Sequence, residues 1–451
     1  MAEKVEHIGK KEIAWSYIGT VFMIGVGVIL LPFILNKMPQ ETVGIWNIFQ
    51  TITALVLLLD FGFRPTFARN ISYIFSGVKT LQRDGVQHTT EDAEVDYSLL
   101  KGTLLAMRHF YRWMALIVFA LLATAGTAYF YYILQKYSGD RQDAMIAWVL
   151  LIAINCYNLY TFYYDALLMG KGYVRQNQQI NILGQAIYVG LAIGLIYAGF
   201  GLTAIVGSQL ISTITRRVLS YRVFFTQEMK SRLAASEMQE PKDILGAITP
   251  NAVKIGLTQL GGFCVNKSAI LSGSAFLTLE EVACYGITMQ VMDILARCAM
   301  VFYQSYLPKL AQCRTENDLA GLRRYYLLCT GSMIAVFIAG GVAWVFLGNW
   351  ALDLIHSQTH FLPTAMLCVM LFIGLLEHNH AQSAGFIMAD NRIPFFIPSL
   401  ASGAATVVLL WLFLSPLQMG VWGLILAPGI AQLAYQNWKW PSVVIKELWG
   451  K

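Results

Sequence analysis

The sequence predicts an all-α polytopic membrane protein with about twelve transmembrane helices in two halves of six. This prediction rests on an apolar composition, on the length of the apolar runs, and on how lysine and arginine are distributed between them. Of the 451 residues, 57% are hydrophobic and 13% are charged, whereas soluble globular domains carry about 25% charged residues. The net charge of +6 does not indicate nucleic-acid binding, because the basic residues lie between apolar runs and not on one polar face.

Apolar runs of about 20 residues, the length that crosses a bilayer as a helix, occur twelve times. They cover roughly residues 13–35, 43–63, 107–132, 144–169, 180–197 and 202–221, and then 247–271, 282–307, 326–347, 361–386, 395–414 and 420–438. We therefore expect an N-terminal lobe over residues 1–221, a cytoplasmic linker over 222–246 and a C-terminal lobe over 247–451. The linker has amphipathic spacing and contains Pro241, which favours a helix lying on the membrane surface, with a solvated linker as the alternative.

The basic residues test this division, because short cytoplasmic loops collect lysine and arginine. With twelve helices, alternate connections lie on the same side of the membrane. One set of connections, together with the two termini, holds 25 basic residues, and the opposite set holds Lys37, Lys136 and Arg141 only. A missed or extra helix would mix the two sets, so the sequence predicts an even number of helices with both termini in the cytoplasm.

The two halves also resemble each other. An offset of 239 residues aligns Glu41, Val43 and Trp46 with Glu280, Val282 and Tyr285, and it superimposes the first two runs on the seventh and eighth without gaps. A repeat in the same orientation after six helices predicts two bundles related by a pseudo-two-fold axis along the membrane normal.

Ionisable residues inside the spans are the candidate functional residues, because burying a charge in a bilayer costs several kcal/mol unless the residue faces a cavity or a partner. The chain has ten of them: Asp60, Arg64, Asp165, Lys254, Lys267, Asp293, Arg297, Glu377, His378 and His380. At 1.5 Å per residue, Lys254 and Arg297 both lie roughly 10–15 Å from the cytoplasmic surface. Glu377 and His380 share that depth, whereas Lys267 lies near the periplasmic end of its span.

Structural roles are the alternative for several of these residues. Asp293 and Arg297 stand four residues apart and can neutralise each other on one helix. Asp60 and Arg64 are close enough to the interface for their side chains to reach it. Lys254 has no acidic residue in its own span, so it needs a partner from another helix or from a ligand. His380 can take up a proton near neutral pH, although packing is the commoner role of a histidine in a helix.

Two stretches near the N-terminus carry a resemblance to a known family. Residues 35–46 (LNKMPQETVGIW) and 57–72 (LLLDFGFRPTFARNIS) resemble the first two helices of the Wzx-type flippases for lipid-linked oligosaccharides such as O-antigen. These proteins share the MOP superfamily with the MATE multidrug exporters. The resemblance implies two six-helix lobes around a central cavity, in the bacterial inner membrane. It implies a transporter, without a cofactor, that moves a polyprenyl-diphosphate-linked oligosaccharide to the periplasmic leaflet by alternating access for surface polysaccharide biosynthesis.

The same resemblance implies that cationic cavity residues attract the anionic diphosphate. Lys254 and Arg297 suit this role by depth and charge, and Lys267 and Arg64 are the further cationic candidates. The candidate charge partners, or residues for coupling to H⁺ or Na⁺, are Asp293, Glu377, His380, Asp60 and Asp165. Twelve asparagines and glutamines in the spans, with tyrosines at 157, 160, 163 and 164, are typical of a water-filled cavity able to hold sugar hydroxyls.

Other functions remain open from the sequence. A cation-coupled multidrug exporter of the same superfamily is the first alternative, although a lysine in the cavity would disfavour cationic drugs. A membrane glycosyltransferase, ligase or polymerase needs catalytic residues on a sizeable outer loop, and the predicted outer loops are short, without an acid pair or a phosphate-binding loop. The seven cysteines are scattered singly, with no close-spaced pair of the kind that binds zinc. We therefore expect a transporter and not an enzyme.

Overall fold

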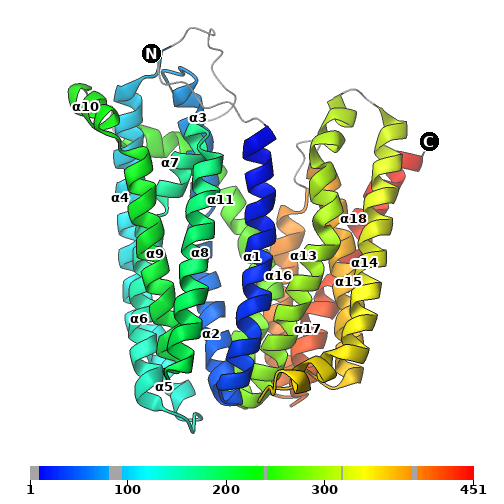
Figure 1. The fold of residues 1–451 in the computed structure, drawn as a ribbon. Coiled ribbons are helices and arrows are strands. Elements are labelled where there is room, and N and C mark those ends of the chain that lie inside the picture. The colour runs from blue at the N-terminus through cyan, green and yellow to red at the C-terminus, as the bar shows by residue number, and fades with distance from the viewer. Residues whose placement is uncertain (1–9, 81–93, 238–240, 316–317, 389–393, 451) are drawn as a thin grey trace. The chain divides into compact units, whose positions relative to one another are not determined.

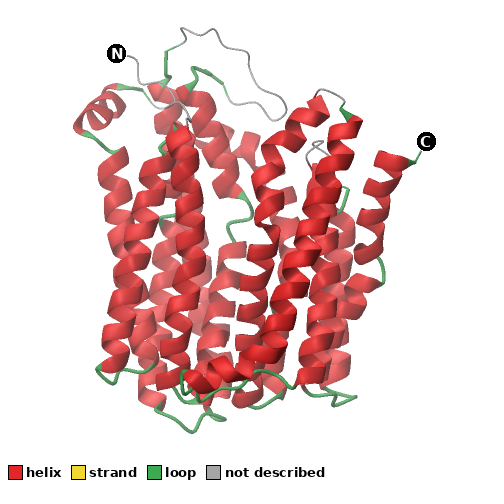
Figure 2. Ribbon diagram, turned by 45° about the vertical axis from the view of Figure 1, so that its right-hand side comes forward, coloured by secondary structure: helices red, strands yellow, loops and turns green. Residues whose placement is uncertain are grey.

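The computed structural model describes residues 10–80, 94–237, 241–315, 318–388 and 394–450. The regular structure in these ranges is helical and contains no strand (Figure 2). The chain divides into two compact units. Unit 1 holds Met1–Ile34 and Ile52–Gly256, and unit 2 holds Leu35–Thr51 and Leu257–Lys451. The predicted linker, residues 222–246, therefore lies in unit 1, and the boundaries predicted for the two lobes remain a prediction.

Unit 1 is built from helices that run side by side (Figure 1). They are α1 (Lys10–Lys37), α2 (Gln40–Leu58), α3 (Phe63–Phe75), α4 (Tyr97–Leu121), a π-helical turn (Leu122–Gly126), α5 (Thr127–Leu134), α6 (Arg141–Tyr160), α7 (Tyr163–Lys171), α8 (Val174–Tyr197), α9 (Leu202–Phe224), α10 (Gln227–Ala235) and α11 (Pro241–Asn266). The last residues of α1, most of α2 (residues 40–51) and the end of α11 belong to unit 2. In unit 1, α8 packs against α9, α3 against α7, and α6 against α4 and α9.

Two of the predicted spans in unit 1 are interrupted. The run over 43–63 ends as α2 at Leu58, and the chain turns through Phe61 (φ 46°) and Gly62 (φ 71°) before α3 begins. Glycine adopts this left-handed region without the steric cost that a side chain brings. The carboxylate of Asp60 accepts the backbone N–H of Arg64 in the first turn of α3, at 3.2 Å to each oxygen. The run over 144–169 is also broken, at Thr161 and Phe162 between α6 and α7, but both residues keep negative φ angles.

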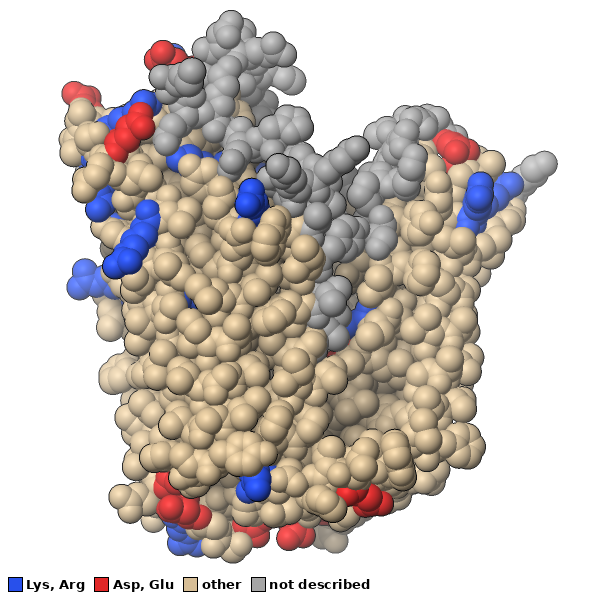
Figure 3. Space-filling model, in the orientation of Figure 1, with Lys and Arg blue, Asp and Glu red and all other residues tan. Residues whose placement is uncertain are grey.

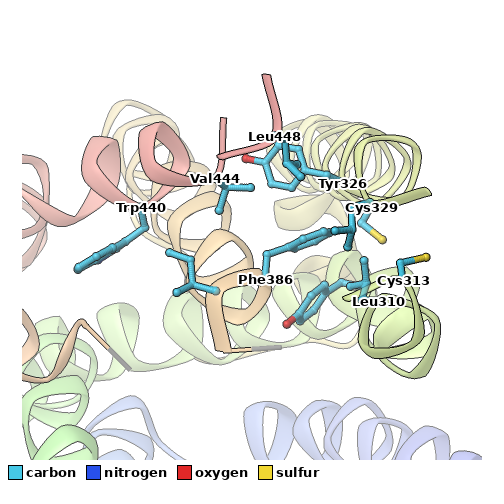
Figure 4. Close-up of a cluster of buried hydrophobic side chains, with 11 residues drawn as sticks. Leu310, Cys313, Tyr326, Cys329, Phe386, Trp440, Val444 and Leu448 are labelled. Atoms are coloured by element: carbon cyan, nitrogen blue, oxygen red, sulfur yellow. The ribbon is translucent and has the colours of Figure 1, made fainter. Parts of the chain in front are cut away.

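Unit 2 contains the end of α11 and the helices α12 (Ser268–Phe276), α13 (Leu279–Thr315), α14 (Leu319–Leu354), α15 (Thr364–Met388), α16 (Phe396–Leu414), α17 (Val421–Leu433) and α18 (Gln436–Trp449). Here α13 packs against α14, α16 against α17, and α15 against α18. Buried side chains from α13, α14, α15 and α18 form a cluster around Phe386 and Tyr326, whose rings meet edge to face at 4.9 Å (Figure 4). This apolar cluster holds four helices of the unit together.

The turn between α1 and α2 packs against α13 within unit 2. Gln40 Nε2 donates to the carbonyl oxygen of Glu280 at 3.3 Å, and Gln290 Nε2 donates to Asn47 Oδ1 at 2.6 Å. The approach is close enough that a Cβ at Gly44 would collide with the carbonyl oxygen of Leu279. These contacts join residues 240 and 243 positions apart, near the offset of the sequence repeat. They join α2 and α13, the two helices that the predicted repeat aligns with each other, and the repeat itself remains a prediction.

Eight helices in the described ranges are long and apolar enough to cross a bilayer. Each of the twelve predicted runs coincides with a helix or with a helix interrupted by a short break, and the count of twelve spans remains a prediction. Large apolar side chains are exposed along the middle of several helices; Ile338, at the middle of α14, is 50% exposed. On the face drawn in Figure 3, the charged side chains of each unit gather mainly toward its ends. This pattern is typical of a protein surrounded by lipid.

Candidate functional site

Unit 2 encloses a cavity of about 90 Å³ between α11, α13, α15 and α17. Two of the predicted coupling residues, Asp293 and Glu377, line it, and His378 is a third ionisable lining residue. Drug-sized ligands occupy pockets of about 300–1,000 Å³, whereas one water takes about 30 Å³. The cavity therefore has room for a few waters or a small cation and is too small for a sugar-diphosphate headgroup.

Asp293 forms an ion pair with Lys267 across two helices, with 2.7 Å between Oδ2 and Nζ. The alternative that Arg297 neutralises Asp293 on its own helix is therefore wrong for the described residues, and so is the expectation that Lys267 lies apart. The reason is a break in span seven: α11 ends at Asn266, and α12 continues to Phe276. Lys267 therefore lies nine residues, or about 14 Å, before the end of α12, where its side chain reaches α13. Arg297 is exposed.

Glu377 joins the cavity to a chain of polar side chains on three helices. Gln432 Nε2 donates to Glu377 Oε1 at 2.9 Å, and Nδ1 of His380 lies 3.7 Å from Glu377 Oε2. The same Nδ1 lies 2.8 Å from Oδ1 of Asn437. Because an amide oxygen only accepts, the proton on Nδ1 donates to Asn437. Nε2 is then the atom of His380 that is able to take up a second proton.

Two amide atoms beside this chain are buried without a hydrogen-bond partner among the described residues. They are Oε1 of Gln432 and Nδ2 of Asn437. Leaving a buried polar atom unpaired costs about 1–3 kcal/mol; a water molecule could satisfy either atom, whereas a cation could contact only the oxygen of Gln432. Gln432 Oε1 accepts only and belongs to the same amide that bonds Glu377, which places two oxygen acceptors near each other.

A second polar group lies in unit 1, at the break between α6 and α7. Nη1 of Arg217 lies 2.8 Å from Oδ1 of Asp165, and Nη2 donates to Asn158 Oδ1 at 2.6 Å. The guanidinium carbon of Arg217 is 5.6 Å from the centroid of the Phe162 ring, and that of Arg64 is 5.0 Å from the same centroid. Asp165 is thus held by a buried arginine from α9, whose side chain is 4% exposed.

The carboxylate of Asp60 also has its hydrogen-bond donors inside unit 1. Besides the backbone of Arg64, its carboxylate accepts the hydroxyl of Tyr111 from α4 at 2.6 Å. Only 6% of Asp60 is exposed, so the expectation that its side chain reaches the membrane interface was wrong. The reason is that the turn before α3 points the carboxylate inward, toward Tyr111. Asp60 anchors the break between α2 and α3.

Comparisons with known proteins find similarity in the fold but not in the sequence. No family model and no curated protein sequence matches the chain. Among solved structures, an inward-facing multidrug resistance MATE family transporter of the MOP superfamily matches with a TM-score of 0.68 and 14% identity, over 97% of this chain and 99% of that one. A ligand complex of the MATE multidrug transporter DinF-BH matches with a TM-score of 0.62 and 15% identity, over 99% of both chains.

The chain has the fold of a MATE transporter. A third structure, of MATE in the bent conformation, agrees, with a TM-score of 0.53 and 12% identity over 98% of this chain and 96% of that one. An all-helical fold like that of a MATE transporter is thus confirmed, and the two lobes of six helices remain a prediction. These structural neighbours are transporters and not enzymes.

The structure describes the side chains of all the acidic candidates but not those of all the cationic candidates. Lys254 lies in α11, but its side chain lies outside the described residues. Arg64 and Arg297 are exposed, and neither forms an ion pair with a described residue.

Arg217 is the residue of this MATE-fold chain that our reading of the sequence missed, because we counted it among the cytoplasmic basic residues. The sequence did contain a signal for its burial. The buried positions of α9 continue at helical spacing through Thr213, Arg217, Ser220 and Phe224, beyond the end of the predicted span. That spacing places Arg217 on the face of α9 that packs into the bundle.

Proposed function

We propose that this protein is a flippase of the bacterial inner membrane. It moves a polyprenyl-diphosphate-linked oligosaccharide from the cytoplasmic to the periplasmic leaflet by alternating access, as a step in surface polysaccharide biosynthesis. The proposal is supported by the MATE fold and by the resemblance of residues 35–72 to Wzx-type flippases. Both termini are cytoplasmic in this proposal, because of the asymmetry in the basic residues.

One observation favours an anionic substrate. Within the predicted spans, Arg64 and Arg297 are exposed without an acidic partner among the described residues. Asp165 pairs with Arg217 and Asp293 with Lys267, while Asp60 and Glu377 are mostly buried against uncharged hydrogen-bond donors. The unpaired charges that the described spans expose are therefore the two arginines, which attract a diphosphate and repel a cationic drug.

The cavity of unit 2 supplies the coupling site in this proposal. Its volume suits a proton or Na⁺ with a few waters, and its acceptors are carboxylate and amide oxygens. Because Lys267 already neutralises Asp293, Glu377 is the carboxylate left to take up a proton or to coordinate Na⁺. Nδ1 of His380, 3.7 Å from Glu377 Oε2, is the neighbouring group of that carboxylate in the proposed site. Asp293 contributes if its pair with Lys267 opens during the cycle.

Cation-coupled multidrug export is the second candidate function. The fold comparisons support it equally, since two of the similar structures are described as multidrug transporters and one of them is a ligand complex. The unpaired arginines favour the flippase, because a cationic drug would gain nothing from them.

Replacing Arg297 distinguishes the two functions. In a strain that depends on this protein, Arg297→Gln should lower surface polysaccharide, because the substrate loses one cationic contact. Arg297→Lys should restore a large part of it, and Arg222→Gln, at an exposed cation near the end of α9, serves as the control. Normal polymer in Arg297→Gln, together with a changed resistance to cationic drugs, would favour the exporter.

A further inference from the structure

A surface of unit 1 joins cations to aromatic rings where α4, α7, α9 and α10 meet. We call it the basic-aromatic shelf, and it consists of Arg108, Tyr163, Tyr164, Tyr221, Phe225 and Lys230. The guanidinium carbon of Arg108 lies 5.7 Å from the ring centroid of Tyr163 and 5.9 Å from that of Phe225. Nζ of Lys230 lies 5.2 Å from the centroid of Tyr221, and the rings of Tyr221 and Phe225 are 5.0 Å apart. Two cations therefore flank one pair of rings.

Both cations are available to an anion. Arg108 and Lys230 are exposed, and neither forms an ion pair with a described residue. The aromatic rings restrain each charge by a cation–π contact, which leaves the N–H groups directed away from the ring free to donate. A phosphate oxygen is a suitable acceptor for both.

The position of Lys230 is set by the docking of α10 on α4. The apolar side chains of Met229 and Leu233 are buried. Arg232 Nη1 donates to the hydroxyl of Tyr97 at 2.8 Å, and Lys101 Nζ donates to the carbonyl oxygen of Ser236 at 2.7 Å. These contacts hold the C-terminal half of α10 on α4, and the buried Met229 and Leu233 fix the face that Lys230 presents. The shelf is therefore largely preformed, and binding costs little ordering entropy.

The shelf lies where apolar, exposed stripes of two helices end. On α9 the stripe follows Ile211, Ile214 and Val218 to Tyr221, each between 37% and 47% exposed. Tyr221 follows Leu202 by 19 residues, or about 28 Å at 1.5 Å per residue, close to the bilayer hydrocarbon thickness of about 30 Å. On α4, the exposed Trp113 marks a similar boundary, as tryptophans do at membrane interfaces. The shelf is thus at the level of lipid headgroups.

We propose that the basic-aromatic shelf binds the phosphate of an anionic bilayer phospholipid, with its acyl chains along the exposed stripe of α9. Arg108 and Lys230 donate to the phosphate from the two sides of the Tyr221 and Phe225 rings. A lipid held there connects α10 to α4 and α9 at the end of unit 1 where the basic residues gather. This inference requires the membrane location of unit 1 but does not depend on which substrate the protein carries.

Native mass spectrometry of the full-length protein in detergent tests the site, with phosphatidylglycerol as the probe and phosphatidylcholine as the zwitterionic comparison. Each basic residue near an anionic lipid surface strengthens binding about fivefold. Arg108→Gln combined with Lys230→Gln should therefore weaken the first phosphatidylglycerol binding step about twenty-five-fold and leave phosphatidylcholine binding unchanged. Arg108→Lys should keep most of the affinity, because it retains the charge.

A matched control is Lys136→Gln, since Lys136 also lies over a tyrosine ring, at 5.1 Å from the centroid of Tyr132, but beyond α5 at the other end of unit 1. Its phosphatidylglycerol binding should equal that of the parent. Equal binding by the double variant and the parent would overturn the proposal, as would an equal loss in the control. A polyprenyl diphosphate that displaces phosphatidylglycerol from the parent at much lower concentration would overturn the assignment to a bilayer lipid and assign the shelf to that anion.

Discussion

The ion pair between Arg217 and Asp165 gives the most direct test of the interior of unit 1. Replacing Arg217 with Met keeps the volume of the stem and removes the guanidinium, which is 4% exposed and bonds both Asp165 and Asn158. Breaking a buried ion pair by removing one partner costs about 3–5 kcal/mol. Because 22% of the Asp165 side chain is exposed, water partly compensates its charge. We therefore expect the free energy of unfolding to fall by about 3 kcal/mol, the lower end of this range.

The measurement is reversible unfolding in mixed micelles, or steric trapping in bilayers, for Arg217→Met, Asp165→Leu and the double variant. The double variant leaves no uncompensated charge, so it should lie within about 1–2 kcal/mol of the parent, since an apolar pair replaces a buried ion pair at little cost. Arg222→Met is the control: its parent side chain is exposed on the same helix, and we expect a change below about 0.5 kcal/mol.

Two results would refute this reasoning. A loss below about 1 kcal/mol in Arg217→Met would mean that the guanidinium reaches water in the membrane-embedded protein. Additive losses in the double variant, with no coupling energy, would mean that the two side chains do not interact.

Three further predictions concern topology, substrate and coupling. A single cysteine at Glu237, in a background without native cysteines, should resist an impermeant thiol reagent added outside intact cells; labelling from outside would contradict the cytoplasmic assignment. Lys254→Ala should abolish export with the protein still folded in the membrane, whereas Lys254→Arg should retain part of it, because the proposed role is a positive charge; normal surface polymer from Lys254→Ala at native expression would remove this residue from the mechanism. Glu377→Gln should weaken the response of reconstituted transport to an imposed proton or Na⁺ gradient more than Asp293→Asn, since Lys267 already neutralises Asp293; an unchanged response in both variants would show that the acids are structural.

The sequence by itself determined the fold class and the positions of the helices. Hydropathy and helical periodicity are local properties, so the apolar runs and the helix in the 222–242 connection could be predicted from neighbouring residues alone. The breaks inside the runs, such as the one after Leu58, were not predicted, because the apolar composition continues across them. The same locality explains why the candidate residues were found: an acid or a base in an apolar run is conspicuous wherever the run lies in the fold. The resemblance of residues 35–72 then implied the superfamily whose fold the comparisons support.

The tertiary structure decided which charges meet. Lys267 pairs with Asp293 because a break after Asn266 alters the level and direction of the lysine side chain, and spacing along one continuous helix cannot express such a break. Arg217 is buried against Asp165 because α9 packs on α6 and α7. A residue that we had counted among the basic residues of a loop is therefore part of the core. Ion pairing depends on which helix faces which and at what height, and those are properties of packing between segments far apart in the chain.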